Sequence, residues 1–142
     1  MYNPIMTFSK RTKYTIPTRI SSSSSQITYY VGPGSLEAGG YRFYDSSQRL
    51  IRPSRIIIQP NITYRFKRLN NSTSHPFYIS SRGVNQSSSP FVLQLSGQGT
   101  YQNGITGSQM VSFQLQDPNV SKIYYYCTTH PLRMQGSFRV SQ

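Results

Sequence analysis

The residues best suited to metal chemistry in this chain lie in one stretch near its C-terminus. Residues 126–140 read YCTTHPLRMQGSFRV, so Cys127, His130 and Met134 follow one another between two runs of strand-forming residues. The other histidine, His75, lies far upstream in the segment SHPFYI. Two His, one Cys and a weakly bound Met are the ligand set of a blue-copper centre. We therefore predict one mononuclear copper site, with His75, Cys127, His130 and Met134 as its ligands.

The types of these side chains suit electron transfer. Thiolate and thioether sulfurs are soft donors that favour Cu(I), whereas imidazole suits several transition metals. A scaffold that holds all four ligands in place would let the metal change charge with little movement. The expected chemistry is therefore the transfer of single electrons.

Each of these residues also has a simpler interpretation. A free Cys is often an inert buried thiol, and the two His could be ordinary loop residues. The metal site is favoured because the only Cys and the only two His of the chain all belong to one pattern. Structural zinc takes four Cys or His ligands, and only three are present. A Cys–His hydrolase would also need an orienting side chain and an oxyanion hole.

The composition argues against several other classes of function. The 142 residues include only three acids, Glu37, Asp45 and Asp117, which lie far apart in the sequence. That scarcity argues against a paired-carboxylate glycosidase and against a calcium or magnesium site. A single Cys excludes an intrachain disulfide framework. We expect no enzymatic activity.

Strands are the elements that must position the ligands. Twelve Tyr, seven Phe and no Trp favour a sheet core built from large aromatic side chains. In residues 62–67, ITYRFK, apolar and polar residues alternate, which is typical of a half-buried strand with a basic outer face. We expect strands at residues 27–31, 41–45, 56–58, 62–67, 77–79, 91–95, 111–116, 123–127 and 138–140. This pattern predicts an all-β sandwich over residues 26–142.

In this order of motifs the sequence resembles the cupredoxin family, the plastocyanin-like blue-copper domains. The resemblance spans about residues 26–140 and rests on SHPFYI (74–79), GVN (83–85), the run at 111–115, DP (117–118), IYYYC (123–127) and the C-terminal motif. It implies a cupredoxin-like Greek-key β-sandwich with equatorial ligands His75, Cys127 and His130 and axial ligand Met134. The chain departs from the family pattern in the three residues between His130 and Met134. It also departs in Pro76, which has no N–H to donate to the Cys sulfur.

The chain is strongly basic, with 15 Lys and Arg and a formal net charge of +12. We expect a polyanionic neighbour, the alternative being that the charge serves solubility alone. Residues 1–25 carry prolines, a Ser tract and only positive charges, which predicts an extended basic N-terminal arm. Contacts with partners are expected from Lys10, Arg11, Lys13, Arg19, Arg65, Lys67 and Arg68. Sequence-specific binding of nucleic acid is not expected, because no known motif for it is present.

Two functions from different classes follow from these features. The first is a copper-binding protein that exchanges single electrons with a redox partner protein. The second is a structural component, for example a minor virus-particle or surface-layer protein, whose sandwich and basic arm contact neighbouring subunits. Binding of nucleic acid without sequence preference is a weaker third. No apolar run of about 18 residues predicts a membrane span, and no apolar core of a secretory signal is present. The compartment is left open, with a virus particle or an intracellular assembly among the options.

Overall fold

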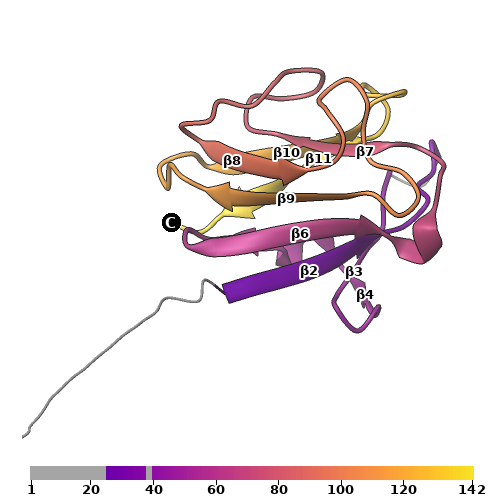
Figure 1. Ribbon diagram of the computed structural model, residues 1–142, viewed down its shortest axis with the longest axis horizontal. Helices are drawn as coiled ribbons and strands as arrows, with labels where there is room; N and C mark the ends of the chain where they lie inside the picture. The colour runs from indigo at the N-terminus through magenta and orange to yellow at the C-terminus, as the bar shows by residue number, and fades with distance from the viewer. Residues whose placement is uncertain (1–24, 38–39) are drawn as a thin grey trace, which may run out of the picture.

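The computed structural model describes residues 25–37 and 40–142, which form two β-sheets around one hydrophobic core (Figure 1). The larger sheet has six strands, in the spatial order β4 (Leu50–Ile51), β3 (Phe43–Tyr44), β2 (Ser25–Val31), β6 (Ile62–Arg68), β9 (Met110–Leu115) and β8 (Leu93–Gly97). The smaller sheet has four, in the order β5 (Ile57–Ile58), β11 (Gln135–Val140), β10 (Lys122–Cys127) and β7 (Phe77–Ser80). Two short 3-10 helices complete the described elements, η2 (Pro53–Arg55) and η3 (Leu69–Asn71).

The expectation of an all-β fold is confirmed. Most neighbouring strands pair antiparallel, but β2 pairs with β6 in parallel, and so does β5 with β11. Parallel neighbours need a long connection between them, and here residues 32–61 link β2 to β6 by way of three short strands. Within the described ranges, no helix is long and apolar enough to cross a membrane.

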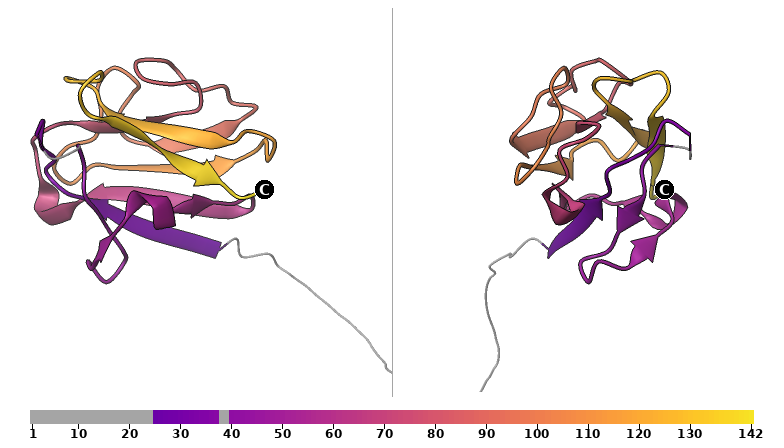
Figure 2. Two further views of the ribbon diagram at one scale, coloured as in Figure 1. Left: turned by 180° about the vertical axis from the view of Figure 1, so that it is seen from behind. Right: turned by 90° about the vertical axis from the view of Figure 1, so that its right-hand side faces the viewer.

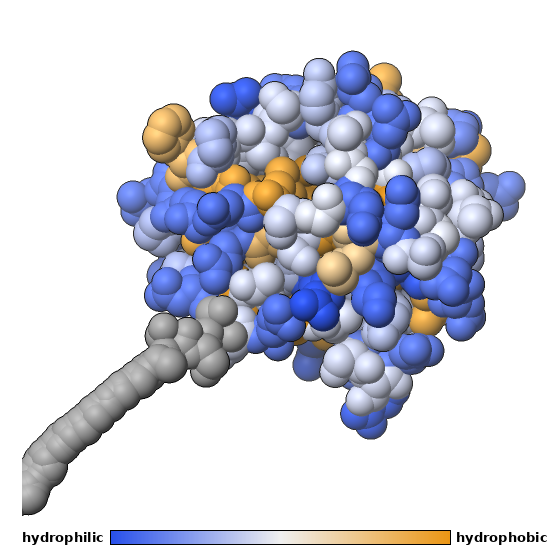
Figure 3. Space-filling view, viewed as in Figure 1, coloured by the Kyte–Doolittle hydropathy of each residue, from blue (hydrophilic) through white to orange (hydrophobic). Residues whose placement is uncertain are grey.

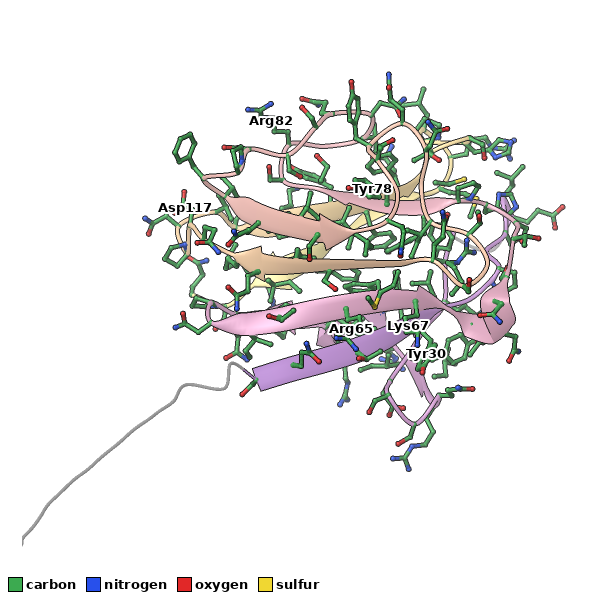
Figure 4. The ribbon with its side chains drawn as sticks, viewed as in Figure 1. Tyr30, Arg65, Lys67, Tyr78, Arg82 and Asp117 are labelled. Atoms are coloured by element: carbon green, nitrogen blue, oxygen red, sulfur yellow. The ribbon has the colours of Figure 1, made fainter. Side chains whose placement is uncertain are left out.

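Aromatic rings from both sheets fill the core. Tyr64 and Phe66 of β6 are fully buried, while Arg65 and Lys67, which alternate with them, are partly exposed. Figure 4 shows Arg65 and Lys67 on the outer side of this sheet. The predicted alternation of buried aromatics and outward cations is therefore confirmed. Across the sheets, the ring of Phe43 packs 4.9 Å from that of Tyr125, edge to face, which is a favoured geometry for aromatic pairs.

Several boundaries differ from the sequence prediction. Ser25 was assigned to the arm, but it opens β2 and pairs with Ile62. Strand β8 begins at Leu93 rather than at residue 91, and Phe91 is 84% exposed in the preceding turn. The short strand β4 was not expected, and β11 begins at Gln135, before the predicted residue 138. The rest of the predicted arm, with Lys10, Arg11, Lys13 and Arg19, lies outside the described residues.

The two ends of the sandwich carry different features. The connection from β6 to β7 and the turn from β10 to β11 lie together at the right-hand end in Figure 1. The end of β11 and the C-terminus lie at the opposite end (Figure 2). The short helix η2 contacts β11. The face seen in Figure 3 is mainly hydrophilic, with smaller apolar areas.

Candidate metal centre

Strand pairing brings the single thiol next to the upstream histidine. Cys127 ends β10 and lies opposite Phe77, the first residue of the neighbouring strand β7. His75 comes two residues before Phe77, so it lies at the same end of the smaller sheet. Cys127 is fully buried, His75 is partly buried and His130 is exposed. The register of one strand pair thus joins two residues that are 52 positions apart in the chain.

The turn between β10 and β11 returns His130 to the thiol. The backbone N–H of His130 donates to the carbonyl of Cys127 at 3.3 Å, and that of Met134 donates to the carbonyl of His130 at 3.0 Å. The N–H of Cys127 then donates to the carbonyl of Met134 at 2.9 Å, which closes the turn. These bonds hold His130 and Met134 close to Cys127 without a helix or a disulfide.

The thiol lies at a similar distance from both imidazoles. The Sγ atom of Cys127 lies 3.8 Å from Nδ1 of His75 and 4.0 Å from Nδ1 of His130. Each residue of this group offers one ligand atom, and these atoms all lie within 4.8 Å of one another. Metal–nitrogen bonds of about 2.0–2.1 Å and a metal–sulfur bond of about 2.3 Å, at roughly 120°, would separate nitrogen and sulfur by about 3.8 Å. The group could therefore hold a metal ion.

The backbone of His75 adopts an unusual conformation that other groups stabilise. Its φ angle is +52°, in the left-handed region that a non-glycine residue rarely occupies. The hydroxyl of Tyr41 donates to the carbonyl oxygens of His75, at 2.5 Å, and of Pro76, at 3.2 Å. Burial, and next the nearby Cys127, raise the pKa of Tyr41, so this phenol stays protonated and able to donate. Such strain persists where surrounding contacts determine the conformation.

Electrostatics favours the neutral form of His75. Partial burial, then the neighbouring His130 and then Arg68, lower the pKa of His75 below its ordinary value. A metal binds the neutral imidazole and competes with protons for it. The surroundings of His75 therefore favour the protonation state that ligates a metal.

Arg68 is buried beside the centre and is not available to a partner, which corrects the sequence prediction for this residue. It is 2% exposed because it lies in phase with Tyr64 and Phe66 on the inner face of β6. Its guanidinium donates to the carbonyls of Ser74 at 2.8 Å, Gly32 at 2.9 Å and Ile105 at 3.0 Å, with a longer contact of 3.5 Å to Val31. Burial lowers the pKa of Arg68. This buried cation ties the segment before His75 to the end of β2.

Met134 follows His130 by four residues and is fully buried. Its methyl group packs against the loop after β2, where a Cβ added to Gly34 would lie only 2.6 Å away. The position of Met134 is thus defined by packing. Its role as the axial ligand stays a prediction.

The sequence analysis missed Thr129, whose hydroxyl lies 3.1 Å from Sγ of Cys127 and 3.1 Å from Nδ1 of His130. A hydroxyl next to a thiolate can donate a hydrogen bond to it, and such bonds tune a metal–sulfur centre. The adjacency of Thr129 to Cys127 and His130 in the sequence was the available signal. For Tyr41 no local signal exists, because it lies in the loop before β3, 34 residues before His75.

Two further predicted partner residues, Arg65 and Lys67, lie within the described part of the chain. Arg65 and Lys67 are on the outer face of the larger sheet (Figure 4). The ammonium of Lys67 lies 5.9 Å from the centre of the Tyr30 ring, which is a cation–π contact. The Nε atom of Arg65 is buried and has no hydrogen-bond partner among the described residues.

Comparisons with known proteins do not assign this fold and site to a family. No family model, no curated protein and no solved structure matches the chain. What the site can do is therefore argued from its own residues.

Proposed function

We propose that this chain is a copper-binding protein with a cupredoxin-like sandwich, and that its centre transfers single electrons. The observation that carries the proposal is the convergence of the only thiol and both imidazoles, with their donor atoms within 4.8 Å of one another. Copper is favoured over zinc because one thiolate, two imidazoles and one thioether are the ligand types of a trigonal site with a weak fourth ligand. Bound there, copper would supply a one-electron couple.

The chain's own residues would perform distinct roles in this function. His75, Cys127 and His130 would hold the ion, with Met134 as a weak fourth ligand. Thr129 would donate its hydroxyl to the sulfur. Because the hydrogen-bonded turn and the aromatic core restrain the ligands, the centre would reorganise little when its charge changes.

Electrons would enter and leave through His130. It is the exposed ligand, whereas Cys127 is fully buried. Leu132, two residues further on, is 78% exposed and offers an apolar contact for a redox partner protein. Burial of the sulfur would protect it from solvent and oxidants, because exposure governs thiol reactivity.

Copper titration of the purified chain tests the proposal. Addition of Cu(II) should give an intense visible charge-transfer band at one equivalent and a reversible one-electron wave in voltammetry. Cys127→Ser should abolish the band. Met134→Leu should shift the band and the potential, whereas the matched control Met110→Leu, on the outer face of β9, should change neither. A chain that stays colourless and retains no copper in equilibrium dialysis would refute the proposal.

A structural role in an assembly is the second candidate, and the charge distribution favours it. Among the described residues, the only ion pair within 4 Å joins Arg49 to Asp45, at 3.7 Å. The three acids can balance only three of the 15 Lys and Arg, so the chain keeps a net charge of +12 however its ion pairs form. Neighbouring subunits or a polyanion could neutralise it. Sedimentation of the full chain tests this candidate. A monomer at every salt concentration, with and without polyanions, would reject it.

A further inference from the structure

A second site of different chemistry lies at the opposite end of β10. The strand begins at Lys122 and ends at Cys127, and a rise of about 3.3 Å per residue separates the two by about 17 Å. Around Lys122 the surface forms a hollow of about 540 Å³ between η2, the start of β10 and the end of β11. Ser54, Ser121, Lys122, Ser137 and Arg139 line it, and we call it the basic hollow.

The two cations of the basic hollow repel each other. Lys122 and Arg139 are direct cross-strand partners in the antiparallel pair of β10 and β11. Both side chains point away from the core, because their neighbours Ile123 and Phe138 are fully buried. Like charges directly opposite each other destabilise a strand pair. A sheet that carries such a pair is stabilised when an anion binds between the two cations.

The acids of the chain do not supply that anion. Asp45 pairs with Arg49, and Glu37 lies in the loop after β2. Asp117 is nearest in sequence, but its Oδ1 accepts the N–H of Asn119, and neither cation of the hollow lies within 4 Å of a described carboxylate. The charge of the hollow is therefore available to a ligand.

Hydroxyl donors complete the lining. Ser54, Ser121 and Ser137 are exposed, and no hydrogen bond between described residues uses their side-chain oxygens. A guanidinium, an ammonium and free hydroxyls are the donors that bind phosphate oxygens. The ammonium of Lys122 lies 5.3 Å from the centre of the Tyr124 ring on the same face, which orients it beside Ser137, the cross-strand partner of Tyr124.

We propose that the basic hollow binds a phosphate group, with Lys122 and Arg139 neutralising its charge and Ser137 donating a hydrogen bond. This site is independent of the metal centre and extends the function beyond it. The phosphate belongs either to a free phosphate compound or to the backbone of a single-stranded nucleic acid, which share the same oxygens.

Titration calorimetry of the full-length, metal-free chain tests the site. Two probes, inorganic pyrophosphate and a 12-residue thymidine oligonucleotide, separate the two sources of phosphate. Saturable binding of either probe is expected, and the tighter probe identifies the source. Lys122→Gln and Arg139→Gln should each weaken binding about ten-fold, as expected for the loss of one charge-assisted hydrogen bond. Arg42→Gln, which removes an exposed cation from the loop before β3, is the matched control and should leave binding unchanged.

Two further variants make the result decisive. Ser137→Ala keeps the charge and should still weaken binding, which a diffuse basic surface would not show. Cys127→Ser should bind the probes as the parent chain does, so failure of the copper proposal would not affect this one. Without ligand, Lys122→Gln should melt no lower than the parent, since it relieves a repulsion. Loss of affinity in Arg42→Gln equal to that in Lys122→Gln, or no saturable binding of either probe, would overturn the proposal.

Discussion

Replacing the buried Arg68 with Met should destabilise the fold and loosen the metal centre together. The side chain is 2% exposed, and its three shortest hydrogen bonds run to the carbonyls of Gly32, Ser74 and Ile105. Met has a similar volume, so the substitution leaves little cavity but removes every donor.

The magnitude follows from the groups left without partners. Each buried carbonyl that loses its donor costs about 1–3 kcal/mol, and three such carbonyls amount to about 3–9 kcal/mol. Part of this total, several kcal/mol, is offset because the variant no longer has to bury a charge. After the offset, the net loss in the free energy of unfolding should be about 3–5 kcal/mol. For a domain of this size that corresponds to a fall in Tm of about 12–20 °C.

Urea denaturation and copper competition measure the two effects. Arg68→Met should lower the urea midpoint and also weaken copper retention, because Ser74 directly precedes His75. Arg68→Lys should recover part of the stability, since an ammonium reaches fewer carbonyls than a guanidinium. Arg42→Met, at an exposed position, should change stability by less than about 0.5 kcal/mol. A midpoint for Arg68→Met that equals that of the Arg42 control would show that the carbonyl contacts do not stabilise this end of the sandwich.

Three other perturbations separate the contributions around the centre. Gly34→Ala should destabilise the fold by about 1–3 kcal/mol and shift the copper spectrum, because Gly34 has a φ of +82° and the new Cβ would clash with the Met134 methyl. The control Gly107→Ala, at φ +61° with open space around it, should show the backbone cost alone. Equal copper spectra for the two variants would contradict the packing argument. Tyr41→Phe removes the donor to the His75 carbonyl, so it should lower the free energy of unfolding by about 1–2 kcal/mol and weaken copper binding. The control Tyr126→Phe loses its hydrogen bond to the Tyr101 carbonyl and should lower stability alone. Unchanged copper affinity in Tyr41→Phe would show that Tyr41 does not position His75. Burial raises the pKa of Tyr126 to about 12, so the folded chain holds this proton more tightly than the unfolded chain does. The free energy of unfolding should therefore be unaffected by this group below about pH 10 and fall by about 1.4 kcal/mol per pH unit as the pH rises toward 12. A urea midpoint that is constant between about pH 9 and pH 11 would refute this.

Local spacing carried much of the fold prediction. The alternation in residues 62–67 has period two, and a strand of that period places its apolar set on one face whatever lies next to it. That is why Tyr64 and Phe66 were assigned correctly to the core. The same alternation extends by one step to Arg68, where residue type alone suggested a surface position and the structure shows a buried one.

The ends of elements were less predictable from the sequence. Phe91 has high strand propensity, yet β8 begins only at Leu93 and leaves it exposed. Propensity describes how a residue fits a pleated surface, but a strand begins only where a neighbouring strand supplies hydrogen bonds. Here β9 supplies them from Leu93 onward.

By itself the sequence determined which side chains could ligate a metal, because the chain has one Cys and two His, and Met134 follows His130 by four residues. It also determined the β-structure, since alternation and strand formers are local properties. Only the tertiary structure decided that His75 lies 3.8 Å from the thiol, that Arg68 faces inward and that Lys122 lies opposite Arg139. These three facts depend on which distant strands become neighbours and in what register, and no spacing within one segment encodes the position of another.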